Sequence, residues 1–139
     1  MSYTEDDLVT RVRGVIADLD YRETTGFDFT KAPAGALDKS FWLSYEAEAP
    51  IGGMNFTEDA RGALTVRVAR STDADYQAAR RTLLADARTI LRAVVRDGAT
   101  TTGEYNVEDT RRVLNIEAPR GAGYLVLTLA MPVSYEATL

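Results

Sequence analysis

The 139-residue sequence contains neither cysteine nor histidine. Without cysteine the chain has no disulfide, no thiolate nucleophile and no thiolate metal ligand. Without histidine it also lacks the commonest metal ligand and the usual general base near neutral pH. These absences remove the side chains of the most frequent catalytic and metal sites. We therefore expect no cofactor and no metal, and an enzyme is disfavoured.

Long apolar runs and an excess of positive charge are missing as well. No run is long enough to span a bilayer, and the opening MSYTEDDLVT lacks the basic flank and apolar core of a secretion signal. The 16 basic and 21 acidic residues give a net charge of −5, which opposes tight binding to nucleic acid phosphates. We expect neither a membrane protein nor a high-affinity DNA-binding protein.

Hydrophobic residues make up 45% of the chain, enough for one buried core at this length, and we expect a single domain over residues 1–139. A helix is predicted over residues 4–20, where Leu8, Val12, Val15, Ile16 and Leu19 fall on one face. Two pairs have capping-box spacing at its start, Ser2 with Glu5 and Thr4 with Asp7. Gly14 in its interior weakens it by roughly 1 kcal/mol relative to alanine, so packing must hold it.

A second, longer helix is predicted over residues 73–96. Its apolar stripe, broken only by Arg80, consists of Tyr76, Leu83, Leu84, Ala87, Ile90, Leu91, Val94 and Val95. Asp73 or Ser71 is expected to cap its amino end, and Gly98 to end it as a left-handed residue. At roughly 36 Å this helix is long enough to cross a whole sheet.

Four strands are expected beside these helices. Residues 40–49 alternate, with Phe41, Leu43 and Tyr45 on one face and Trp42 on the otherwise polar face. Residues 64–69 also alternate and follow a predicted turn at residues 59–62. The two strands are expected to pair antiparallel.

The remaining strands are residues 111–117 and 124–131, joined by a compact connection. The segment 124–131 is apolar on both faces except at Thr128, so it belongs in the middle of a sheet or against a neighbouring subunit. Residues 133–139 are expected to form an edge strand or to extend toward another chain, and residues 99–110 a loop or weak edge strand. The order of elements predicts an α+β fold (mixed α/β): a predominantly antiparallel mixed sheet of four to six strands with two helices packed on one face.

Residues 21–39 lack periodicity and contain Phe27 and Phe29. A loop this long is unusual in a compact domain unless it binds something or is disordered. One interpretation is a short strand over residues 26–30 that packs both rings on the core. The alternative is a segment that binds a partner.

Candidate chemical sites each have a simpler explanation. Glu46 and Glu48 share a strand face, but no third oxygen ligand follows at a recognisable spacing, which favours a solvated face. Asp73 and Asp75 resemble the start of a calcium loop but lack the glycine and closing glutamate, so helix capping is favoured. The long helix carries Arg80, Arg81, Arg88, Arg92 and Arg96, which form either a solvated face or a subunit contact.

The early helix, the strand FWLSYEAEA, the unit LTVRVARS leading into YQAARRTLLADARTILRAVVRD, and the closing YLVLTLAMPVSYEATL together resemble the phage tail terminator family. Tail terminators form a ring on top of a long tail tube. The resemblance covers most of the chain and rests on the order and size of the elements. It carries over no individual residues, because the family offers no invariant residue that can be placed on this sequence.

The resemblance implies a mixed sheet with helices on one side and a structural role in the virion with no enzymatic activity, at the head-tail neck, after assembly in the host cytoplasm. It implies a homohexameric ring that ends tail tube growth and binds the tail tube protein and a neck or head completion protein. DNA would pass through the channel only as cargo, which suits a negative net charge.

Aromatic and arginine residues are suitable material for such a ring contact. The residues expected at the subunit or tube interface are Phe27, Phe29, Trp42, Phe56, Arg80 and Arg88. If Phe27 and Phe29 serve this role, replacing both with serine should leave the monomer folded but impair assembly.

Two other classes stay open at this point. One is a different neck or tail component, such as a head completion or head-tail joining protein or the tail tube subunit. The other is a small ligand-binding domain or enzyme that uses Tyr45, Glu46 and Glu48 in a sheet-lined pocket.

Overall fold

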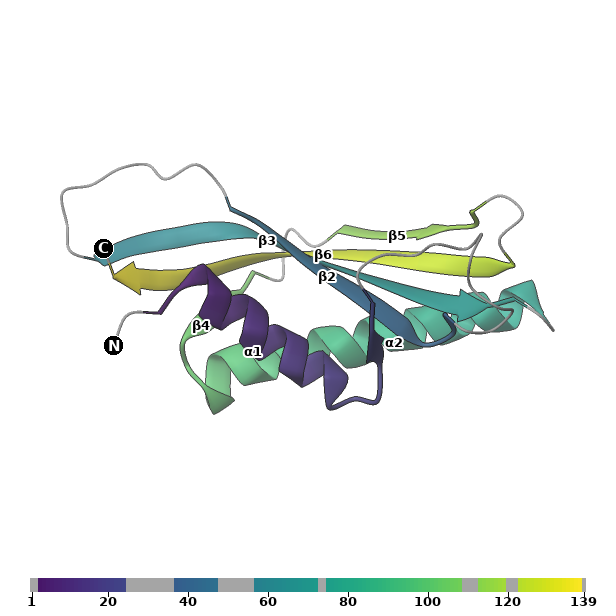
Figure 1. Ribbon diagram of the computed structural model, residues 1–139, viewed down its shortest axis with the longest axis horizontal. Coiled ribbons are helices and arrows are strands. Elements are labelled where there is room, and N and C mark those ends of the chain that lie inside the picture. Colours follow the sequence, from purple (N-terminus) through teal and green to yellow (C-terminus); the bar gives the residue numbers. More distant parts are fainter. Residues whose placement is uncertain are drawn as a thin grey trace.

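The computed structural model describes residues 3–24, 37–47, 57–72, 75–108, 113–119 and 123–138. In this part of the chain the elements are α1 (Glu5–Ala17), β1 (Arg22–Glu23), β2 (Ser40–Ala47), β3 (Thr57–Ser71), α2 (Tyr76–Arg96), the short π-helical turn η1 (Asp97–Thr101), β4 (Tyr105–Val107), β5 (Val113–Glu117) and β6 (Tyr124–Thr138). The fold is α+β, with two helices and a six-stranded, mostly antiparallel sheet, as predicted (Figure 1).

Strands β3 and β6 form the spine of the sheet. They pair antiparallel along their full 15-residue length, from Thr57 opposite Thr138 to Ser71 opposite Tyr124. Strand β2 pairs antiparallel with β3, as predicted, and the two-residue β1 pairs in parallel with β2. Strands β4 and β5 both pair antiparallel with β6. Figure 1 shows the two long strands running the length of the molecule.

The predicted turn at residues 59–62 is wrong, because these residues lie inside β3. Asp59 and Gly62 have the composition of a turn, but each is paired with a residue of β6, Glu136 and Val133. Strand pairing along β6 outweighs the local preference of these residues.

Strand β6 lies in the middle of the sheet, which confirms the prediction for residues 124–131. Residues 133–138 are not a separate edge strand but continue β6: residues 133–135 lie between β3 and β4, and residues 136–138 pair with β3. Proline is tolerated at position 132 because its nitrogen, which has no hydrogen to donate, points away from β3. The Pro132 carbonyl points to the same side and accepts a bond from the Glu108 amide. On that side Pro132 lies between the pairing of Ala130 with β5 and that of Val133 with β4.

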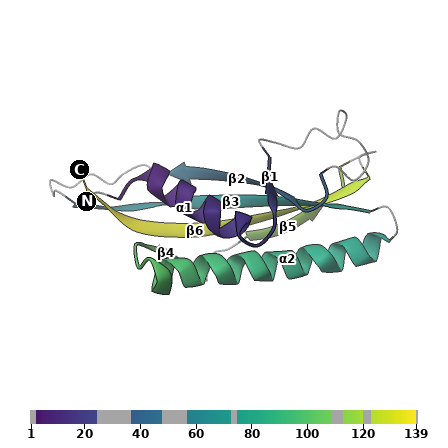
Figure 2. The same ribbon diagram turned by 60° about the horizontal axis from the view of Figure 1, so that its bottom comes forward.

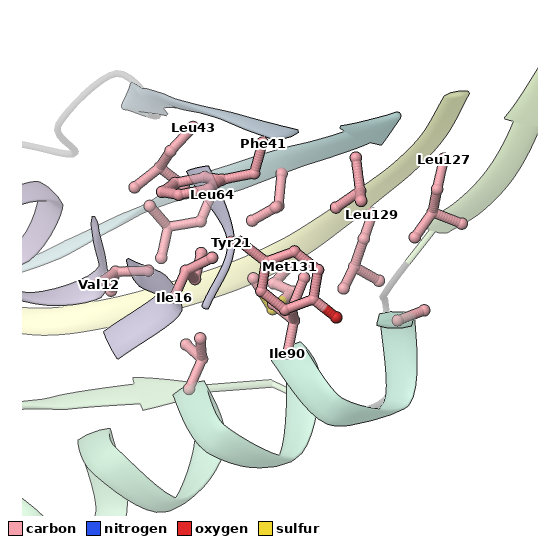
Figure 3. Close-up of a cluster of buried hydrophobic side chains, with 14 of the residues drawn as sticks. Val12, Ile16, Tyr21, Phe41, Leu43, Leu64, Ile90, Leu127, Leu129 and Met131 are labelled. Atoms are coloured by element: carbon pink, nitrogen blue, oxygen red, sulfur yellow. The ribbon is translucent and has the colours of Figure 1, made fainter. Parts of the chain in front are cut away.

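Both helices pack on one face of the sheet. Figure 2 shows α2 lying along the sheet, with α1 beside it in the same layer. One hydrophobic cluster joins α1, α2 and the inward residues of β2, β3 and β6. In Figure 3, Val12 and Ile16 from α1 and Ile90 from α2 meet Phe41 of β2 and Leu64 of β3. The predicted amphipathic faces of both helices therefore bury the same side of the sheet.

The amino end of α1 is closed by one of the two predicted capping boxes. The Thr4 side chain accepts a bond from the Asp7 amide, and the Asp7 carboxylate accepts one from the Thr4 amide. Helix α2 begins later than predicted. Its cap is Asp75, whose carboxylate accepts a bond from the Gln77 amide, rather than Asp73 or Ser71.

The predicted left-handed stop at Gly98 is also wrong. The chain continues from α2 into η1, which includes Gly98, and the first left-handed glycine after the helix is Gly103, with φ 66°. A Cβ atom at Gly98 would lie 2.5 Å from a ring carbon of Tyr105 and 2.7 Å from its carbonyl oxygen. Glycine is therefore needed at this position for close approach rather than for its dihedral angles.

Short strands complete the edges of the sheet. The three-residue β4 fits the weak edge strand expected within residues 99–110, whereas β1 had no signal in the sequence. The short strand proposed over residues 26–30 lies outside the described residues. Neither described helix combines the length and apolar character that a bilayer span requires.

Candidate functional site

Asp97, at the end of α2, lies in a buried polar cluster that joins α1 to α2. Arg11 of α1 donates to its carboxylate from Nη2 at 2.6 Å and from Nε at 3.1 Å. The Tyr105 hydroxyl lies 2.8 Å from Asp97 Oδ2 and 3.0 Å from the Val94 carbonyl oxygen. The bonds from Arg11 and Tyr105 lower the pKa of Asp97, while burial and the nearby carboxylate raise the pKa of Tyr105.

Tyr3 lies next to this cluster. Its ring meets the ring of Tyr135 edge to face, with centroids 5.5 Å apart. Its hydroxyl is buried and has no hydrogen-bond partner among the described residues. Burial, together with the negative charges of Glu104, Asp7 and Asp97, raises the pKa of Tyr3 to about 12.

Asp86 of α2 is the centre of a second buried polar cluster, which joins α2 to the residue before β1 and to the end of β3. The Tyr21 hydroxyl donates to it at 2.6 Å, and Arg70 donates from Nε and Nη2, each at 2.8 Å. Asp38 lies 3.9 Å from the same guanidinium and accepts a bond from the Ser71 amide. Burial and the bond to Asp86 raise the pKa of Tyr21.

Both clusters hold elements together. Each carboxylate is buried and accepts at least three hydrogen bonds, so its oxygens are occupied by donors from other elements. No group of three or more potential metal-binding side chains occurs in the described part of the chain. Glu46 is exposed on β2, while Glu48 lies outside the described residues.

The sheet face opposite the helices carries a row of side chains that crosses four strands. Trp42 of β2 pairs with Arg67 of β3, Arg67 with Thr128 of β6, and Thr128 with Asn115 of β5. We call this the outer row. The guanidinium carbon of Arg67 lies 4.8 Å from the centroid of the Trp42 ring, a cation–π contact.

Small residues flank the outer row on the same face. Toward the C-terminal end of β6, Thr65 pairs with Ala130 and Ala63 with Pro132. On the other side of the row, Ala69 pairs with Val126. Trp42 and Arg67, both half-buried, are the two large side chains of the outer row. Tryptophan and arginine are the side chains most often found at the energetic centre of protein–protein contacts.

At one end of this face a second, smaller cluster contains Ala69, Tyr124 and Val126, with Leu37 packed against it. The Tyr124 hydroxyl accepts a bond from the Leu37 amide. The outer row lies beyond this covered end.

The arginines of α2 lie on the opposite side of the molecule. Arg80 and Arg88 are exposed, and neither forms an ion pair with a described residue. The prediction that Arg80 breaks the buried stripe is wrong. The charged residue in the stripe is Asp86, which lies three residues after Leu83 and four before Ile90, on the same face of the helix.

The predicted interface residues therefore fall into separate places. Trp42 lies on the outer sheet face, and Arg80 and Arg88 lie on the helical layer. Phe27, Phe29 and Phe56 lie outside the described residues.

Sequence reasoning missed Arg67 and the two buried carboxylates. Asp86 had a clear signal, because it is the single acidic residue of α2 and lies on the apolar stripe. Arg67 lay on the polar face of its strand, but its contact with Trp42 depends on a register that the long connection between the strands did not reveal. Asp97 follows the last residue of α2, and no local pattern links it to Arg11.

No model of a known protein family matches the sequence, and no curated protein matches it.

Proposed function

We propose that this protein is a structural virion component, a tail terminator that forms a ring capping the tail tube, ends tube polymerisation and joins the tail to the neck. Its partners are further copies of the same chain, the tail tube protein and a neck or head completion protein. DNA passes through the ring as cargo. The protein works through shape and contact, with no catalytic step.

The fold supports this proposal, because a mixed sheet with helices on one side is the architecture that the resemblance implies. The strongest support for this proposal is the difference between the two faces of the sheet. The helices cover one face, while the other carries the half-buried pair of Trp42 and Arg67 among small residues. Half-buried aromatic and arginine side chains are typical of a surface that another protein covers.

The long paired strands suit a rigid ring subunit. Strands β3 and β6 are paired at every residue and span the length of the molecule (Figure 1). Strand β2 pairs with β3 from Gly62 to Ala69, so residues 57–60 of β3 lie outside the pairing of these two strands. Strand edges and broad sheet faces commonly form the heterologous contacts that close into rings.

Negative-stain electron microscopy of the purified protein tests this function. A tail terminator forms single closed rings that do not stack as the concentration rises. Stacked rings or growing tubes would instead identify a tail tube subunit, the second candidate. Isolated protomers that bind a small molecule near Tyr45 and Glu46 would contradict both structural roles.

A further inference from the structure

Helix α2 concentrates the positive charge of the molecule. Five of the 16 basic residues lie in it, but only one of the 21 acidic residues. That one, Asp86, is buried and bound by Arg70 and Tyr21. The outer side of α2 therefore carries arginines that no carboxylate of the same helix balances.

These arginines also repel one another. Arg88, Arg92 and Arg96 follow at intervals of four residues, so neighbouring guanidinium groups share one side of the helix. All three are exposed, and none pairs with a carboxylate in the part of the chain that the structure describes. Like charges at this spacing weaken a helix, so Arg88 and Arg92 do not stabilise the monomer. Only Arg96, in the last turn of α2, gains from the negative pole of the helix dipole.

The carboxyl end of α1 carries the opposite charge in an equally unfavourable place. Asp18 is the C-cap of α1, and Asp20 follows it with φ 68°. Carboxylates at this end meet the negative pole of the helix dipole, and the last turn of α1 contains no basic residue. Both side chains are exposed, and neither forms an ion pair with a described residue.

We propose that these two charge sets meet between copies of the chain. The arginine face of α2, defined by Arg88, Arg92 and Arg96, binds Asp18 and Asp20 of a second copy. This inference rests on the proposed ring and names one of its contacts.

The geometry favours a contact that repeats from copy to copy. The two sets lie on neighbouring helices of one layer (Figure 2), so a copy that offers its arginines to one neighbour keeps its carboxylates for the next. Such a heterologous contact closes into a ring when the rotation between copies allows it. A second copy is favoured over nucleic acid because acidic residues outnumber basic ones in the chain as a whole.

Charge reversal separates assembly from folding. Arg92→Glu places a carboxylate between Arg88 and Arg96, and Asp18→Arg places a cation at the negative pole of α1. Each change favours the helix that carries it, so weaker assembly cannot be attributed to unfolding. By sedimentation velocity, each single variant should dissociate at a protein concentration about tenfold higher than wild type, and the double variant should recover assembly because the pair is restored in reverse.

Asp6→Arg is the matched control, because Asp6 is an exposed acidic residue at the other end of α1. It should leave assembly unchanged. Wild-type rings together with unaffected single variants, or no recovery in the double variant, would overturn this contact and leave the proposed function standing. A wild-type protein that remains monomeric would overturn the ring itself. If the wild type binds duplex DNA and Arg92→Glu abolishes this binding while the rings persist, the arginine face binds nucleic acid phosphates rather than a second copy.

Discussion

At the scale of single residues, two buried carboxylates connect the helices to the rest of the fold. Asp97 links α1, α2 and β4, and Asp86 links α2, β3 and the chain before β1. A buried carboxylate is stable only when donors surround it, and both have donors from at least two other elements. Removing one of these groups leaves its partners without an acceptor.

Asp97→Asn should lower the free energy of unfolding by about 1–3 kcal/mol at neutral pH, because Arg11 loses its charged partner. The pKa of Asp97 is lower in the folded protein than in the unfolded chain. Its contribution is therefore present above the ordinary value of about 4 and is lost as the pH falls through the lowered folded value. Urea unfolding at several pH values should show the gap between wild type and variant closing below pH about 4. A gap that stays constant in acid would contradict this account.

Tyr3→Phe should raise the free energy of unfolding by about 1 kcal/mol at neutral pH, because it removes a buried hydroxyl that lacks a partner. The pKa of Tyr3 rises to about 12 on folding, so the wild type also loses stability as the pH rises above the ordinary value of about 10. The advantage of the variant should then grow in alkali. Tyr105→Phe is the control, and it should destabilise because it removes a bond to Asp97. A Tyr3→Phe protein less stable than wild type at pH 7 would show that the hydroxyl is bonded.

At the scale of elements, the end of α2 is set by packing rather than by a stop signal. The helix passes into η1, whose turn brings Gly98 against the ring of Tyr105 and Asp97 within reach of Arg11. Glycine is needed there because a side chain would enter the space of Tyr105.

Gly98→Ala and Gly14→Ala should change stability in opposite directions. An added methyl at Gly98 meets the Tyr105 ring at 2.5 Å, which should cost about 1–3 kcal/mol. Nothing lies within 4 Å of the same methyl at Gly14, inside α1, so alanine there should stabilise by about 0.5–1 kcal/mol. Thermal unfolding of the two variants measures both effects. Equal changes in both would mean that helix propensity alone decides.

The sequence predicted the elements whose residues repeat regularly and missed those that depend on distant partners. Helices α1 and α2 and strand β2 were visible from their apolar periodicity. The extension of β3 through Asp59 and Gly62 was not, because pairing with distant strands, β6 at both residues and β2 at Gly62, holds these turn-forming residues in a strand. The cap at Asp75 shows the usual uncertainty of helix ends, where several acidic residues compete.

At the scale of the whole molecule, the sheet has one face covered by helices and one carrying the outer row. The sequence placed Trp42 on the outer face correctly, since strand alternation alone determines it. It did not reveal the partner Arg67, which a distant strand supplies. Of the predicted interface residues, the structure puts Trp42 and the α2 arginines on opposite sides, so one subunit has two surfaces available for neighbours.

Trp42→Ala should weaken ring assembly by about tenfold or more, because a central tryptophan contributes strongly to protein–protein contacts. The monomer should stay folded, since the side chain is only half-buried. Ser44→Ala, on the same face of the same strand, is the matched control and should have little effect. Sedimentation equilibrium measures the assembly of each variant, and circular dichroism checks that its monomer is folded. Equal assembly of both variants would remove the outer row from the interface.

The most direct test of the central claim is the native mass of the wild-type protein over a wide concentration range. A ring-forming tail terminator should give one discrete species at six times the chain mass of 15.2 kDa, and that species should not grow further. A single chain at every concentration, or masses that increase without limit, would contradict the account.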